Sequence, residues 1–78
     1  MDKWIVVTIG EGLFPNERTV QLPTVDGVVS LFVSVNQIDE ARHALKVRVL
    51  DEDERYALVQ VPSQGGGTVA KVERAAVS

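Results

Sequence analysis

LKVRVLDEDERYALVQV, residues 45–61, contains two runs of alternating side chains separated by four acidic residues. Successive side chains of a β-strand point to opposite faces, so the alternation predicts two strands, each with one apolar face. Aspartate favours turns because its carboxylate accepts hydrogen bonds from nearby backbone N–H groups. The stretch therefore predicts a β-hairpin onto which the other strands pack. Its expected inward residues are Leu45, Val47, Val49, Ala57, Val59 and Val61.

Two registers of this hairpin can be compared. A two- or four-residue loop places Gln60 opposite Leu45 and Tyr56 opposite Val49. A three-residue loop at 52–54 gives a cleaner apolar face, and a buried face is what fixes register. We therefore expect the three-residue loop, which requires a left-handed residue near Glu54. Its pairs are Val49 with Ala57, Val47 with Val59, and Leu45 with Val61.

Alternation bounded by turn residues predicts six strands in all. The first is apolar on both faces, which is typical of a central strand. Pro23 is expected to end the second strand because proline cannot donate to a ladder, and Asp26-Gly27 is the expected tight point of the next turn. The six ranges are Lys3–Ile9, Arg18–Leu22, Val28–Val35, Leu45–Leu50, Arg55–Val61 and Thr68–Glu73.

The segments between these strands are short. Residues 36–44, NQIDEARHA, are the helix candidate, with Asn36 as N-cap. Nine residues are marginal for an isolated helix, so a short helix or a helical turn is expected. Residues 62–67, PSQGGG, predict a flexible loop, and residues 74–78 are expected to fray.

The loop at 11–16, EGLFPN, contains two large apolar residues, Leu13 and Phe14. The favoured interpretation is that they fold over one end of the core, because a small domain needs such cover. The alternative is that they form an exposed contact for a partner.

Five or six short strands with tight turns and little helix predict an all-β domain, a small antiparallel β-barrel spanning residues 1–78. The strand lengths and the long first loop are similar to those of SH3-like barrels. An OB-like barrel is the alternative, because it also places a short helix between its third and fourth strands. The resemblance lies in architecture and not in motif.

Composition restricts the classes of function. The chain has no cysteine, so neither a disulfide nor a cysteine zinc site is possible. A net charge of −3 disfavours a surface that attracts nucleic acid or anionic membrane over its whole extent. No apolar run approaches the ~20 residues that span a bilayer, and Trp4–Ile9 is too short for the core of a signal peptide. We therefore expect a cytoplasmic protein with no membrane partner.

The sequence contains few residues that could carry out catalysis. His43 is the only histidine, and a Ser-His-Asp set would need Ser30 or Ser34, neither of which lies in a G-x-S-x-G elbow, together with Asp39. The acidic run 51–54 lacks the glycine and glutamate of an EF-hand loop, and the glycines at 65–67 lack the G-K-[ST] ending of a phosphate loop. We expect no enzyme activity, cofactor or metal.

A basic stripe is the basis of the alternative function. Lys46 and Arg48 share the polar face of one strand, and Lys71 or Arg74 joins them if the last strand lies nearby. Small barrels bind single-stranded nucleic acids by stacking bases on aromatic rings. Here the acidic turn adjoins the stripe and the net charge is negative, so a solvated face is favoured over nucleic-acid binding.

Contact with another protein is favoured by apolar residues outside the assigned core. An open apolar patch of such a size is unusual on a monomer. Cover by residues 36–44 or by the Leu13-Phe14 loop is equally compatible with the sequence, because one register slip reverses both faces. The outward residues are Trp4, Val6, Phe32, Tyr56 and Leu58.

The sequence thus predicts a non-catalytic protein–protein interaction module, whose partner is an unidentified protein or a second copy of the chain. The candidate contact residues are Trp4, Leu13, Phe14, Phe32, Tyr56 and Leu58.

Overall fold

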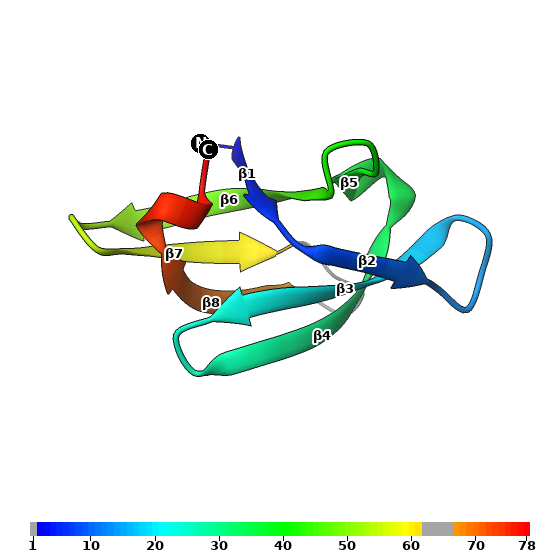
Figure 1. Ribbon diagram of the computed structural model, residues 1–78, viewed down its shortest axis with the longest axis horizontal. Helices are drawn as coiled ribbons and strands as arrows, with labels where there is room; N and C mark the ends of the chain where they lie inside the picture. Colours follow the sequence, from blue (N-terminus) through cyan, green and yellow to red (C-terminus); the bar gives the residue numbers. More distant parts are fainter. Residues whose placement is uncertain (1, 62–66) are drawn as a thin grey trace.

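The computed structural model describes residues 2–61 and 67–78, and its long elements are all β-strands (Figure 1). The strands form two antiparallel sheets, one ordered β1-β6-β7-β8 with β5 also paired to β6, and one ordered β2-β3-β4. Two single-turn 3-10 helices, Val35–Gln37 and Arg74–Ala76, complete the described elements. The strands are β1 Asp2–Val6, β2 Thr8–Glu11, β3 Glu17–Thr24, β4 Gly27–Ser34, β5 Ile38–Asp39, β6 Ala44–Glu52, β7 Tyr56–Val61 and β8 Thr68–Glu73.

The predicted all-β, antiparallel class is confirmed, but the pairings among the described strands do not close a barrel. The predicted loop at 62–67 and the glycine run at 65–67 lie outside the described residues, except for Gly67.

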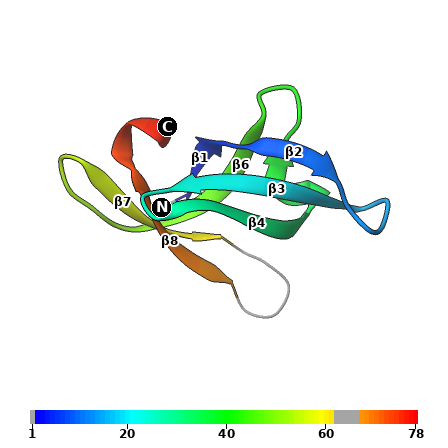
Figure 2. The same ribbon diagram turned by 60° about the horizontal axis from the view of Figure 1, so that its bottom comes forward.

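The first predicted strand is divided between the two sheets. Ile5 lies opposite Leu45 on β6, whereas Ile9 lies opposite Val20 on β3. Val7, between β1 and β2, is buried, and its N–H donates to the His43 carbonyl at 2.9 Å. One bent segment therefore connects the two sheets (Figures 1 and 2). The prediction of two buried faces was wrong, because Val6 points to solvent.

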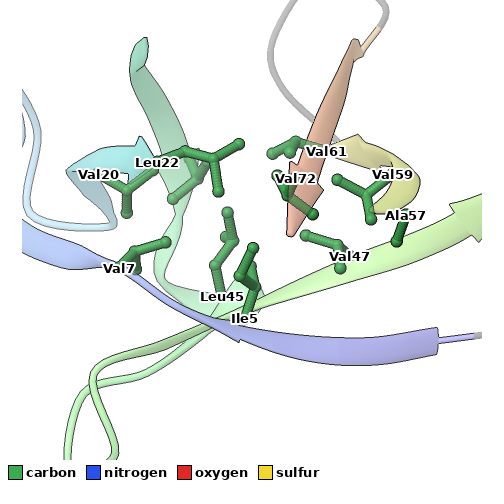
Figure 3. Close-up of a cluster of buried hydrophobic side chains, with 11 residues drawn as sticks. Ile5, Val7, Val20, Leu22, Leu45, Val47, Ala57, Val59, Val61 and Val72 are labelled. Carbon is green, nitrogen blue, oxygen red and sulfur yellow. The ribbon is translucent and has the colours of Figure 1, made fainter. Parts of the chain in front are cut away.

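The core lies between the sheets and takes aliphatic side chains from both of them (Figure 3). The predicted inward face of the hairpin is confirmed, because five of its six residues belong to the core and Val49 packs against it. The buried cluster is Ile5, Val7, Val20, Leu22, Val33, Leu45, Val47, Ala57, Val59, Val61 and Val72.

The hairpin register differs from the predicted one. Val49 pairs with Val59 rather than with Ala57, and a β-bulge between Val49 and Asp51 shifts the pairing towards the turn. The loop between β6 and β7 is residues 53–55. Hydrogen bonds to Asp53 hold this turn in place of the expected left-handed residue. The Asp53 Oδ1 atom accepts the N–H groups of Arg55 and Tyr56 at 2.8 Å each.

The prediction that Pro23 ends its strand was wrong. Strand β3 continues to Thr24, and Pro23 lies opposite Val28. Antiparallel bonds alternate between the two sides of a strand, and residue 23 faces the β2 side. Because β2 begins at Thr8, opposite Gln21, no ladder bond is lost at the proline.

The turn that follows comes one residue earlier than expected. Val25 and Asp26 are its central residues, and Gly27 begins β4 with φ +118°. The Thr24 hydroxyl donates to the Gly27 carbonyl at 2.7 Å and accepts the Asp26 N–H at 3.1 Å.

Residues 36–44 contain part of a single helical turn rather than a longer helix. Ser34, not Asn36, is the N-cap, and its hydroxyl accepts the Asn36 N–H at 3.3 Å. The chain then becomes extended because Ile38 pairs with Leu45 on β6. Pairing against the core therefore overrides the helical tendency of this segment.

The expected fraying of residues 74–78 was also wrong. After the 3-10 turn, Val77 bridges to Ile5. The backbones of Ser78 and Trp4 exchange hydrogen bonds of 2.9 and 2.8 Å. These contacts hold the end of the described chain against the free side of β1.

Candidate protein-contact site

The loop between β2 and β3, residues 12–16, projects from one end of the molecule (Figures 1 and 2). Its Leu13 and Phe14 side chains are 76% and 63% exposed. The favoured interpretation, that these two residues cover the core, was wrong. The backbone turns back at Glu17 to enter β3, so the loop stays outside the space between the sheets.

Glu17 fixes the backbone on both sides of the apolar pair. This residue is only 6% exposed; its Oε1 accepts the Leu13 N–H at 3.1 Å, and its own N–H donates to the Phe14 carbonyl at 3.0 Å. Gly12 permits the close approach, because a Cβ at this position would lie 2.5 Å from the Glu17 carbonyl oxygen. The loop is therefore held by contacts that any larger residue at position 12 would disturb.

Arg18 joins the loop to a second part of the chain. Its Nη1 donates to the carbonyls of Pro15 at 2.9 Å and Glu17 at 2.8 Å. Its Nε pairs with Glu40 Oε1 at 2.7 Å, in the turn after β5. These contacts order the loop before any partner arrives, which reduces the entropy lost on binding.

An open hollow of about 600 Å³ lies beside the apolar pair. Apolar and charged groups meet in it, which suits a partner that presents an apolar side chain next to polar ones. Its lining residues are Glu11, Gly12, Leu13, Phe14, Pro15 and Arg18.

The other candidate contact residues lie outside the core but do not form one patch. Phe32 is 45% exposed on the outer face of the β2-β3-β4 sheet. Trp4, Tyr56 and Leu58 belong to β1 and β7 of the other sheet. Cations cover two of these rings: the Arg42 guanidinium lies 5.6 Å from the Trp4 ring centre, and Lys71 Nζ lies 4.6 Å from that of Tyr56.

The candidate basic stripe is interleaved with acidic groups and an aromatic ring. Lys46 Nζ lies 3.8 Å from Asp2 Oδ2, and Lys71 sits over Tyr56. Arg48 is exposed and lies opposite Asp2 in the ladder. Lys46 and Arg48 lie on β6, and β7 separates that strand from Lys71 on β8.

A groove of about 250 Å³ near the β6–β7 turn combines acidic residues with Tyr56 and Lys71. Within it, the pKa of Asp53 is lowered because its carboxylate accepts the N–H groups of Arg55 and Tyr56 and lies near the Lys71 and Arg55 charges. The full lining is Asp51, Glu52, Asp53, Tyr56, Ala57, Leu58 and Lys71.

His43 is exposed in the turn before β6, with φ +52°. Residues 2–61 and 67–78 contain no group of three or more histidine, cysteine or acidic side chains arranged to hold a metal ion. No helix in these ranges is long and apolar enough to cross a membrane.

Sequence reasoning missed the residues that brace the loop. Gly12 and Glu17 flank the apolar pair in the sequence, which was a usable signal, but the burial of Glu17 depends on how β3 enters its sheet. The pairing of Arg18 with Glu40 joins residues 22 positions apart and leaves no local pattern.

The chain was compared with known proteins in three ways. No protein-family model matches it, no curated protein matches it, and no solved structure matches it.

Proposed function

We propose that this chain is a non-catalytic protein–protein interaction module that binds its partner through Leu13 and Phe14. The observation that carries the proposal is the exposure of these two adjacent side chains, 76% and 63%, on a loop fixed by the buried Glu17. Large apolar anchors supply most of the energy of many interfaces, and an ordered loop loses little entropy on binding. The partner is a protein segment with an apolar pocket or side chain at the centre of its contact.

A displayed-peptide library tests this function, because it requires no named partner. The immobilised wild-type protein should enrich peptides whose binding falls at least tenfold in the double variant Leu13→Ser/Phe14→Ser. The control is Val6→Ser/Val69→Ser, because both of these valines are exposed and lie outside the loop. Both variants should unfold at the wild-type midpoint, since surface changes usually alter stability by less than about 0.5 kcal/mol.

Two outcomes would contradict the proposal. One is the enrichment of no peptide above background. The other is a set of peptides that bind the loop variant as tightly as the wild type.

Nucleic-acid binding through Lys46, Arg48 and Lys71 is the disfavoured alternative, because Asp2 and Tyr56 already contact two of these cations. Retention on single-stranded DNA or RNA that falls steeply with salt would support it, because phosphate contacts release counterions. The proposed module should show no such retention at physiological salt.

Three finer assignments belong to the same proposal. The two sheets and the bent segment that joins them support a partly open, SH3-like barrel, with an OB-like arrangement as the alternative. We place the protein in the cytoplasm, without a membrane partner. We also assign it no cofactor.

A further inference from the structure

In the part of the chain that the structure describes, strand β4 has one free edge. Within the described residues it pairs with β3 alone and forms the margin of the β2-β3-β4 sheet (Figure 1). The Val35 N–H donates to the Asn16 carbonyl at 3.0 Å, and this bond shows which residues of β4 point their backbone groups towards β3. Because antiparallel bonds alternate, residues 27, 29, 31 and 33 bond to β3. The backbone groups of the remaining four, which we call the edge residues, point away from β3: Val28, Ser30, Phe32 and Ser34.

This edge lacks the features by which proteins usually prevent strands from pairing with other chains, such as charges, proline or a bulge. Its eight residues, GVVSLFVS, carry no charge, and their ladder with β3 is regular. The other exposed edges differ. β2 has only four residues, including Glu11, and β8 carries Lys71 and Glu73. The Lys71 carbonyl is also occupied, because it accepts the Val25 N–H at 3.0 Å.

The side chains of the edge residues are suited to a partner strand. Val28 is 65% exposed and Phe32 is 45% exposed, and they alternate with serines on the outer face. A neighbouring strand would cover both apolar side chains and satisfy the outward backbone groups together. The occupant is therefore an extended, uncharged strand.

We propose that the occupant is β4 of a second copy of this chain, paired antiparallel with Ser30 on the two-fold axis. A two-fold contact requires a surface that complements itself. Strand β4 carries no charge, so two copies of it can lie side by side without repulsion between like charges on the strand, although each chain carries a net charge of −3. This register places Val28 opposite Phe32 of the partner subunit, and aromatic pairs with β-branched residues stabilise sheets. The product is a continuous six-stranded sheet.

This inference goes beyond the proposed function, because it uses the edge of β4 and does not depend on the Leu13-Phe14 loop. One strand pair is smaller than a standard interface of about 1,200–2,000 Å², so the dimer is weak. Association should therefore appear only towards the upper end of a concentration series that reaches about 1 mM.

Single cysteines test the register. The chain has no cysteine, so Ser30→Cys and Ser34→Cys each introduce one thiol on the same face of the same strand. Directly opposite residues in a hydrogen-bonded pair have Cα atoms about 5.5 Å apart, which a disulfide can span. The two copies of Ser34 would lie about 27 Å apart, because each is four residues from the axis. Mild oxidation should therefore cross-link Ser30→Cys at least tenfold more than Ser34→Cys, and equal or absent cross-linking would overturn the register.

A charged pair tests the dimer itself. Ser30→Lys places two ammonium groups opposite each other at the axis, whereas Gln21→Lys places the same charge one strand further in, because Gln21 lies opposite Ser30 on β3. In sedimentation runs up to about 1 mM, wild type and Gln21→Lys should dimerise and Ser30→Lys should remain a monomer. A monomeric wild type, or equal dissociation by both lysines, would reject the proposal.

The loop variant Leu13→Ser/Phe14→Ser should dimerise like wild type. If the dimer forms but no peptide is enriched, the loop function fails and the edge contact stands. If peptides are enriched but the chain stays monomeric, the edge contact fails alone.

Discussion

Gly12 and Glu17 determine how the apolar pair is displayed. The absence of a side chain at position 12 lets the chain pass against the Glu17 backbone, and the Glu17 carboxylate then binds the Leu13 N–H. These contacts leave the side chains of Leu13 and Phe14 exposed to solvent, but they fix the position of the backbone at these two residues. Exposure and order at the same site are what make the loop suitable for recognition.

Gly12→Ala should destabilise the protein by about 1–3 kcal/mol, because the new Cβ would meet backbone atoms that cannot move independently. The matched control is Gly10→Ala. A Cβ there would lie 3.9 Å from the Thr19 carbonyl oxygen, an ordinary van der Waals contact, so no loss is expected. Urea unfolding of the three proteins measures the difference, and equal midpoints for both variants would show that the close approach is not formed.

Asp53 gives a pH-dependent prediction. Its pKa in the folded chain is lowered from 3.8 by the N–H groups of Arg55 and Tyr56. A lowered folded-state pKa stabilises the fold above the unfolded value, and this contribution is lost as the pH falls through the folded pKa. Asp53→Asn keeps the acceptor oxygen but removes the charge. The stability difference between wild type and Asp53→Asn should therefore be largest above pH 3.8 and shrink in acid, and a difference that stays constant with pH would contradict the assigned contacts.

At the scale of elements, the β6–β7 hairpin carries much of the core. Val47 and Val59 are both buried. Truncation of either to alanine should cost about 1–3 kcal/mol, because buried methyl groups are lost and a cavity remains. Val69→Ala, on an exposed position of β8, should change the unfolding free energy by less than about 0.5 kcal/mol. Unchanged midpoints for both core variants would mean that the inward face is misassigned.

The elements also show what could be inferred before the structure. The alternation of Val47 and Val49 with charged residues correctly predicts the buried face of the strand. The face on which a strand side chain lies depends only on whether its position is odd or even. The register was not predictable in this way. The bulge after Val49 adds a residue without moving the apolar positions to the other face, so alternation does not reveal it. The bend at Val7 was missed for a similar reason, since both of its flanks read as strand.

The substitution Phe32→Ser tests whether a side chain of strand β4 contributes to the dimer. Phe32 lies on the outer face of β4, opposite Thr19, and outside the core. The substitution should weaken the dimer at least tenfold in sedimentation runs and leave the thermal midpoint nearly unchanged, because aromatic anchors contribute strongly to interfaces. A large loss of thermal stability would instead show that Phe32 belongs to a second internal cluster.

At the scale of the whole molecule, the two proposed contact surfaces lie at different places on the β2-β3-β4 sheet. The Leu13-Phe14 loop projects from one end of the molecule, and the free edge of β4 runs along the margin of its sheet (Figure 1). The sequence predicted Leu13, Phe14 and Phe32 as candidates, but it combined Phe32 with Trp4, Tyr56 and Leu58 on one face. Which sheet each strand joins depends on long-range pairing, and local alternation contains no information about that.

Chemical-shift mapping by NMR tests most directly whether the loop is the binding site. Nitrogen-labelled protein is titrated with a peptide that the wild-type chain has enriched from the library. The largest amide shifts should occur at residues 11–18, with little change at Lys46, Arg48 and Lys71, because the peptide covers Leu13 and Phe14 while the sheets remain as they are. Largest shifts around those three basic residues, or shifts spread through the core with none at the loop, would contradict the proposed function.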